Sequence, residues 1–199
     1  KSLDIVDFMR EIVYFSGNAV TTGNFKDLMK AGRMDIACHA VIMAFFISNK
    51  LRENVKLHLF FYGPPDPPKH LELMPKINEN FQMSKKDIAG LIKRMLFKYK
   101  KGKKIEAFPG CFIEKLSLLN FINKLSNKEI YILDKNGEDI RDIEIKEDPI
   151  FILGDHEGIQ KRELKEINKI AKKVSLGDIT YFSSQVITIL NNELDRRNL

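Results

Sequence analysis

Apolar runs alternate with polar segments along this chain of 199 residues, and glycine or proline punctuates the polar segments. Runs of strand length predict strands at residues 10–16, 55–62, 70–74, 111–113, 129–133 and 150–153. Longer or helically periodic stretches predict helices at 35–50, 84–100, 118–125, 160–172 and 179–196, the last with Asp178 as N-cap. Because strands and helices alternate, we expect an α/β fold in which a parallel sheet carries helices on both faces.

Composition fits one soluble globular domain, with 44% hydrophobic and 30% charged residues. Neither an apolar run of membrane-spanning length nor a signal peptide is visible, which predicts a cytoplasmic protein without membrane attachment. Cys38 and Cys111 lack CxxC spacing, and the four histidines lack metal-ligand spacing. We therefore expect free thiols and no metal.

The net charge of +6 permits binding to a polyanion such as RNA, although lysine-rich genomes produce the same bias. The densest basic cluster spans residues 98–104. A solvated helix end explains this cluster slightly better than a phosphate-binding patch does, because lysines at a helix C-terminus complement its dipole.

A glycine loop, Gly154-Asp155-His156-Glu157-Gly158, directly follows the apolar run 149–153. Such a loop lets a ligand approach the backbone closely, but two carboxylates here would repel phosphates. The loop thus favours a cationic or hydroxyl-rich ligand, and S-adenosylmethionine is both. A plain strand-to-helix turn capped by Asp155 is about equally compatible with these residues.

Two further polar turns follow predicted strands, at Leu133-Asp134 and at Ser175-Leu176-Gly177. Parallel sheets bind ligands at the carboxyl ends of their strands, so the three loops together indicate one site. The chain contains neither a G-x-G-x-x-G motif nor a Walker lysine, which disfavours dinucleotides and ATP.

The C-terminal segment resembles the knotted half of SPOUT methyltransferases, and residues 9–197 resemble the archaeal TrmY family. The motifs that carry this resemblance are Met9-Arg10-Glu11-Ile12, Gly32-Arg33-Met34-Asp35-Ile36, Phe46-Ile47-Ser48 with Arg52, Tyr62-Gly63-Pro64-Pro65 and Asn136-Gly137-Glu138-Asp139. Each motif is weak alone, and the ordered set is fairly specific.

The resemblance implies a single SPOUT domain over residues 9–199 with a C-terminal trefoil knot, preceded by residues 1–8 as an extension or an artificial remnant. It implies a homodimer packed through the knot that methylates N1 of pseudouridine at position 54, in the tRNA T-loop. It assigns S-adenosylmethionine as cofactor, held by Leu133, Asp134, Gly154, Asp155, His156, Gly158, Ser175, Leu176, Gly177, Asp178, Ile179, Thr180 and Val186.

The resemblance also makes Arg33, Asp35 and Arg52 catalytic or RNA-binding residues. Each has a plainer interpretation. Arg33 and Asp35 can be a surface ion pair at a helix start, and Arg52 can compensate a helix dipole. His156 is more easily explained as a hydrogen-bonded loop residue than as a proton acceptor.

Two departures from the family pattern bear on chemistry. Asn54 stands where the family carries an aspartate, and Gln185-Val186 stand where it carries a histidine and a cysteine. Three alternatives therefore stay open: a sister SPOUT enzyme acting on rRNA, a degenerate RNA-binding SPOUT domain, and a generic α/β protein that binds a small molecule.

Overall fold

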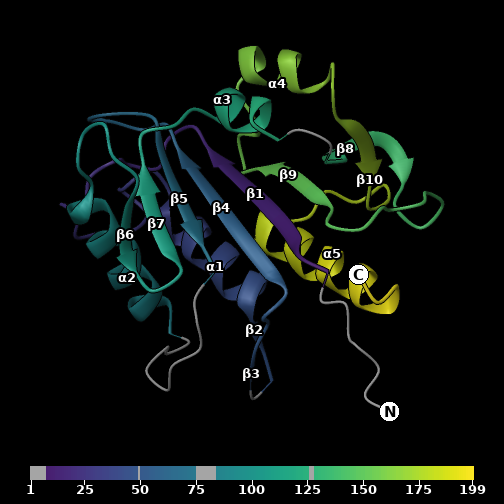
Figure 1. Cartoon of the computed structure of the whole chain (residues 1–199), viewed down its shortest axis with the longest axis horizontal. Coiled ribbons are helices and arrows are strands. Elements are labelled where there is room, and N and C mark those ends of the chain that lie inside the picture. Colours follow the sequence, from purple (N-terminus) through teal and green to yellow (C-terminus); the bar gives the residue numbers. More distant parts are fainter. Residues whose placement is uncertain (1–7, 49, 75–83, 126–127) are drawn as a thin grey trace.

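The computed structural model describes residues 8–48, 50–74, 84–125 and 128–199 (Figure 1). Its strands are β1 (Arg10–Ser16), β2 (Phe46–Ile47), β3 (Lys50–Leu51), β4 (Val55–Phe61), β5 (Lys69–Leu73), β6 (Ile105–Phe108), β7 (Cys111–Glu114), β8 (Ile130–Asp139), β9 (Ile150–Gly154) and β10 (Lys172–Ser175). Its helices are α1 (Met34–Phe45), α2 (Lys85–Lys98), α3 (Leu118–Asn123), α4 (Lys161–Ile167) and α5 (Ser183–Arg196). Residues 1–7 of the predicted extension lie outside the described part.

Eight strands form one sheet in the order β10-β8-β9-β1-β4-β5-β7-β6. The pairs from β10 to β4 are parallel, which confirms the predicted parallel α/β sheet for that half. The pairs β4–β5, β5–β7 and β7–β6 are antiparallel, so the sheet as a whole is mixed. Short connections after β4 and β6 leave no room for the crossover that parallel pairing requires.

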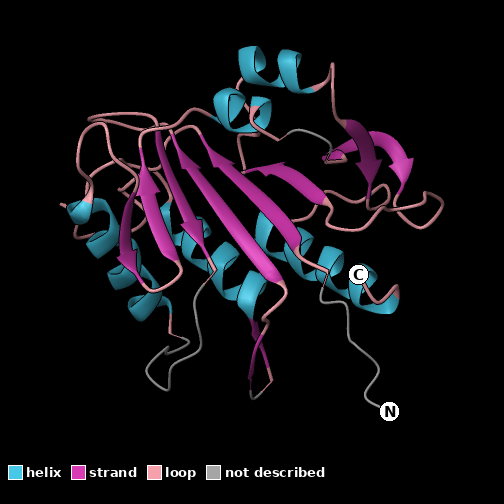
Figure 2. Ribbon diagram, in the orientation of Figure 1, coloured by secondary structure: helices cyan, strands magenta, loops and turns pink. Residues whose placement is uncertain are grey.

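Helices cover the two faces of the sheet unequally (Figure 2). Helices α1, α2 and α5 pack on one face, where the inward side chains of β1 are Ile12 and Tyr14. Helices α3 and α4 pack on the opposite face with Val13 and Phe15, and in Figure 1 they lie at one end of it. Alternation along a fully buried strand thus feeds two hydrophobic cores.

Helix α1 ends at Phe45, five residues before the predicted end. Phe46 is extended, with φ −88° and ψ 129°, and it starts the β2–β3 hairpin that the apolar pattern did not reveal. An aromatic and a β-branched residue in succession, Phe46-Ile47, favour this extended backbone, although their hydrophobicity continues the helix pattern.

The last two helices are shorter than predicted. Helix α4 ends at Ile167, and residues 172–175 form β10 instead of continuing the helix. Helix α5 begins at Ser183, so the start predicted at Ile179 is wrong, and Asp178 is not its N-cap. Gly177, with φ +103°, redirects the chain into an irregular segment that reaches the N-cap residue Phe182.

A buried guanidinium joins the first strand to the last helix. Arg10 is 1% exposed, and its Nη1 atom donates to the side chains of Asn191 (3.2 Å) and Asp195 (2.9 Å), both on α5. Its Nη2 atom donates to the carbonyl oxygen of Leu199. A buried charge requires such partners, so Arg10 fixes the end of α5 against the start of β1. Among the described residues, no helix is long and apolar enough to cross a membrane.

Candidate functional site

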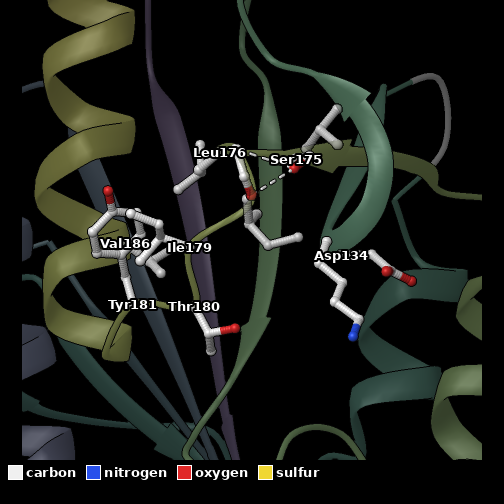
Figure 3. A pocket seen from close by; sticks show the side chains of 11 residues that line it. Asp134, Ser175, Leu176, Ile179, Thr180, Tyr181 and Val186 are labelled. Atoms are coloured by element: carbon white, nitrogen blue, oxygen red, sulfur yellow. Dashed lines mark hydrogen bonds between the residues drawn. The ribbon is translucent and has the colours of Figure 1, made fainter.

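Two adjoining cavities lie where β8, β9 and β10 give way to loops. The smaller, of about 150 Å³, lies between the turn after β10 and the middle of β8; Figure 3 shows Val186 and Tyr181 on its α5 side and Asp134 on its β8 side. The larger, of about 420 Å³, extends along the glycine loop to the start of α5. The two cavities share Leu133, Thr180, Tyr181 and Val186, so they form one continuous site.

Every cofactor residue predicted from the sequence lines one of these cavities except Asp178, which is exposed and lines neither. The structure therefore brings together three loops that lie up to about 50 positions apart in the chain. Sequence reasoning did not assign to the site Phe182, the N-cap of α5, or Ser183 and Gln185 in its first turn, all of which line the larger cavity. The misplaced start of that helix hid their position.

The glycine loop folds back on itself. Asp155 and Gly158 form an isolated bridge, and Asp155 Oδ1 accepts from the backbone N–H of Glu157 at 2.9 Å. A Cβ on Gly154 would lie 2.6 Å from the backbone of Gly158. Asp155 thus caps this turn and not helix α4, whose N-cap is Gln160. Gly154 is required by the loop's own backbone packing.

Asp155 also has an unused polar atom. Its side chain is buried and lines the larger cavity, and its Oδ2 has no hydrogen-bond partner among the described residues. The hydroxyl of Tyr14 is also buried without a partner there, and burial, with smaller contributions from Asp155 and Asp35, raises the pKa of Tyr14. Of these two atoms, Asp155 Oδ2 belongs to a residue that lines a cavity, and such an unpartnered atom indicates a ligand or water that satisfies it.

The turn after β10 is organised by one hydroxyl. Ser175 Oγ accepts from the N–H of Gly177 at 3.1 Å and lies 3.2 Å from its carbonyl oxygen. On the opposite wall, strand β8 continues to Asp139, so Leu133 and Asp134 lie at an irregularity within it and not at its end. Asp134 pairs with Lys173 at 2.9 Å, and this bond lowers the pKa of its carboxyl group.

Arg33 is the N-cap of α1, and Asp35 lies in its first turn, directly before the cavity residue Ile36. The guanidinium holds the carboxylate in two bonds, Nε to Oδ1 and Nη2 to Oδ2, each 3.0 Å long. These bonds lower the pKa of Asp35 and occupy both of its oxygens, which makes it a poor proton acceptor. Arg33 keeps 39% of its side chain exposed and is available to a further anion.

Arg52 lies elsewhere. It follows β3 and not the end of α1, and it pairs with Asp195 through two bonds of 2.7 and 2.6 Å. Asp195 is twelve residues beyond Ser183 along α5, about 18 Å at 1.5 Å per residue. Within one subunit, therefore, the structure does not bring Arg52 to the cavities.

The remaining predicted positions have ordinary surroundings. His156 lines the larger cavity and lies 3.8 Å from Glu157, a pair that is ionic only when the imidazole is protonated. Gln185 accepts a bond from the N–H of Phe182, and Val186 contributes to the wall of both cavities. Asn54 lies near Arg52, away from this site, and its carbonyl accepts from the N–H of Arg10.

Comparison with known proteins settles the family. Residues 9–199 match the model of a family described as "Putative SAM-dependent RNA methyltransferase". The chain belongs to this family.

Its relatives include archaeal enzymes named tRNA (pseudouridine(54)-N(1))-methyltransferase. The one from Methanosarcina acetivorans is 37% identical over 94% of this chain and 92% of its own length. The one from Pyrococcus abyssi is 35% identical over 94% of this chain and 98% of its own. The TrmY resemblance is thereby confirmed.

Solved structures confirm the SPOUT fold. A crystal structure of Archaeoglobus fulgidus Nep1 bound to S-adenosylhomocysteine superposes with a TM-score of 0.62, covering 95% of this chain and 98% of that one at 13% identity. At this identity the likeness concerns the fold alone.

Proposed function

We propose that this protein methylates N1 of pseudouridine 54 in tRNA, with S-adenosylmethionine as methyl donor. The observation that carries the proposal is the near full-length similarity to enzymes named for that reaction, at 35% and 37% identity. The cavities at the three loops supply the site that such a reaction needs.

The residues that line the cavities suit the chemistry of the cofactor. Leu133, Leu176 and Val186 give the smaller cavity apolar walls suited to an adenine ring. In the larger one, the unpartnered Oδ2 of the buried Asp155 suits an ammonium group or a hydroxyl. When bound, the cofactor supplies a methyl group that its sulfonium already activates.

The protein's contribution to the reaction is then mainly alignment. The target nitrogen must lie in line with the methyl group, and holding two reactants in that geometry removes much of the entropic barrier. The N1 proton of pseudouridine must also leave, so an acceptor or a water relay is needed. Asp35 is poorly suited to that role because Arg33 engages both of its oxygens.

Arg33 is the residue that we assign to the RNA. It is partly exposed, three positions before the cavity residue Ile36, and its planar guanidinium suits a phosphate. The target base must leave its stack to enter a cavity, so contacts to flanking phosphates would position the opened loop. The net charge of +6 suits such a polyanion.

We further propose that residues 9–199 form one SPOUT domain with a trefoil knot and act as a cytoplasmic homodimer. The path of the C-terminal segment supports the knot. After edge strand β10 the chain returns to pack α5 against α1, and Arg197 donates to the carbonyl oxygens of Ile140 and Ile143 in the segment between β8 and β9.

The substrate is tested by mass spectrometry of nucleosides after the protein acts on tRNA transcripts with methyl-labelled S-adenosylmethionine. One transcript carries pseudouridine at position 54 and a matched one carries uridine. We expect label in 1-methylpseudouridine from the first and none from the second, because N1 of uridine is the glycosidic nitrogen. Equal labelling of both transcripts would contradict the proposal.

The same assay with a pseudouridylated rRNA fragment addresses the sister-enzyme alternative, which the departures at Asn54, Gln185 and Val186 favour. Methylation of the rRNA fragment with none on tRNA would move the assignment to rRNA. RNA binding without methylation of either would indicate a degenerate domain.

A further inference from the structure

A chain of polar side chains is buried across the sheet on the face opposite α1 and α2. Glu11 of β1, His58 of β4, His70 of β5 and Glu114 of β7 follow one another across four neighbouring strands. Both histidines are 1% exposed and pack against Phe121 of α3. This region is on the other face of the sheet from α1 and α5, so it is separate from the candidate methyltransferase site.

The outer nitrogen of each histidine faces a carboxylate. His58 Nε2 lies 2.9 Å from Glu11 Oε2, and His70 Nδ1 lies 3.1 Å from Glu114 Oε1. Glu11 is also paired with Lys128 at 2.6 Å, which keeps it ionised. An ionised carboxylate only accepts hydrogen bonds, so both outer nitrogens must carry the proton of their ring.

This assignment leaves no proton between the two inner nitrogens. His58 Nδ1 and His70 Nε2 face each other at 2.9 Å. If each neutral ring carries its single proton on the outer side, two lone pairs point at one another. A cation between them resolves the conflict, either as a shared extra proton or as a metal ion.

The position of Glu72 favours a metal ion over a shared proton. Glu72 lies directly opposite His58 in the β4–β5 register and two positions from His70 on the same strand face. One ligand atom from each of His58, His70 and Glu72 lies within 4.8 Å of the others. A shared proton needs no third group, whereas two imidazoles and a carboxylate are the protein ligands of many zinc sites.

We propose that His58, His70 and Glu72 form a binding site for a divalent transition-metal ion, with Zn²⁺ as the ion of best fit. At Zn–N distances of about 2.0–2.1 Å, tetrahedral geometry separates two ligating nitrogens by about 3.4 Å, so the rings need to move apart by about 0.5 Å and to turn until both lone pairs point at the ion. Glu11 and Glu114 would orient the ligand rings as outer carboxylates do in other metal sites.

The position of the site indicates a structural ion. It links β4 to β5 directly, and through the outer carboxylates it extends to β1 and β7. Those strands join the parallel half of the sheet to the antiparallel half. Entry is possible from the side of Glu72, whose side chain is 18% exposed and pairs with Lys104 at 2.9 Å.

The proposal is tested on the full chain without a histidine tag, stripped by a chelator and then titrated with Zn²⁺ by calorimetry. We expect one ion per chain and a higher Tm after addition. Glu72→Gln keeps the shape of the side chain and a bond to Lys104, and we expect it to weaken zinc affinity at least tenfold. His39→Gln and Glu53→Gln, at exposed positions, serve as controls that should bind like the unaltered protein.

Co²⁺ gives an independent measurement that does not depend on a variant folding. In the unaltered protein we expect visible absorption bands of a four- or five-coordinate nitrogen and oxygen site, displaced by one equivalent of Zn²⁺. The proposal is overturned if the unaltered protein binds no zinc, or if Glu72→Gln binds it equally well. It is also overturned if ¹⁵N spectra show an N–H–N bond between the two imidazoles that zinc leaves unchanged.

Discussion

At the scale of single residues, the partner of each arginine decides what that arginine does. Arg33 is held by Asp35 at the start of α1 and keeps an exposed edge for an anion. Arg52 donates from both of its terminal nitrogens to Asp195, and 14% of its side chain is exposed. The two residues come from two different sequence motifs, and only Arg33 lies at the helix start that leads into the cavity residue Ile36.

The two arginines should therefore respond differently to substitution. We expect Arg33→Ala to lower tRNA affinity about tenfold to a hundredfold, the cost of one charge-assisted bond of about 1.5–3 kcal/mol, with cofactor affinity nearly unchanged. Arg52→Ala should instead lower the free energy of unfolding by about 1–2 kcal/mol, since its pair with Asp195 is partly buried. Fluorescence anisotropy with tRNA and urea unfolding measure the two effects.

Arg33→Lys is the matched control, because it keeps the positive charge but not the planar guanidinium. It should retain part of the RNA affinity. A loss of RNA affinity in Arg52→Ala at unchanged stability would restore the assignment of Arg52 to the RNA.

At the scale of elements, the site is made by loops whose shape the sheet fixes. The glycine loop starts directly at the end of β9 and is bonded to β1 through Asp155 N–H and the carbonyl of Phe15 at 2.8 Å. Ser183 Oγ, at the start of α5, donates to the carbonyl of Gly154 at 2.9 Å. The loop is thus held between strand and helix, and its geometry depends on backbone contacts.

Gly154→Val should break that geometry. The added Cβ would lie 2.6 Å from the backbone of Gly158, which cannot move aside as a side chain does. We expect calorimetric affinity for S-adenosylhomocysteine to fall by at least about a hundredfold, equivalent to about 2.7 kcal/mol. Gly158→Ala is the comparison. Its Cβ meets open space, and because φ is +76° the substitution should lower the free energy of unfolding by about 1 kcal/mol. Equal affinities for Gly154→Val and the unaltered protein would contradict this account.

Elements with local signals were predictable from the sequence. Strand β1 contains the apolar run Ile12–Phe15, strand β4 is rich in apolar residues, and Ser84, which accepts from the N–H of Asp87, marks the start of helix α2. The start of α5 was not predictable, because Asp178 has the chemistry of an N-cap while the chain stays irregular to Phe182. The irregular segment lines the cavities, and local propensity does not encode its conformation.

The same limit applies to groups that pairing assembles. Twelve positions separate His58 from His70 in the sequence, a spacing typical of no metal motif. The antiparallel register of β4 and β5 brings them to 2.9 Å. Register is set by the whole hydrophobic pattern and the turn geometry. The expectation of no metal rested on sequence spacing, and spacing alone does not contain this information.

At the scale of the whole molecule, one subunit leaves apolar surface near its site. Ile179 is 67% and Phe182 is 73% exposed, both in the segment that leads into α5. In contrast, Ile187 and Leu190 of α5 are fully buried within the subunit. An interface that used α5 would therefore form around its first turn and the preceding segment.

We expect light scattering at micromolar concentration to give a mass of twice 23.0 kDa, as a two-fold homodimer requires. Phe182→Glu should shift the protein toward the monomer, because a charge in an apolar interface is costly. Phe97→Glu, at another phenylalanine with 65% exposure, should leave the mass unchanged. A monomer for the unaltered protein would count against the dimer.

The contacts of Arg10 also determine when the sheet can form during synthesis of the chain. Strand β1 lies in the middle of the sheet, between β9 and β4, and its buried guanidinium takes its partners from residues 181 to 189 positions later. Until the ribosome has made the end of the chain, β1 lacks the counter-charge of Asp195, and before residues 150–154 are made it also lacks β9, one of its two neighbouring strands. Contacts of such long range slow folding, so the native sheet closes only after the last helix has left the ribosome.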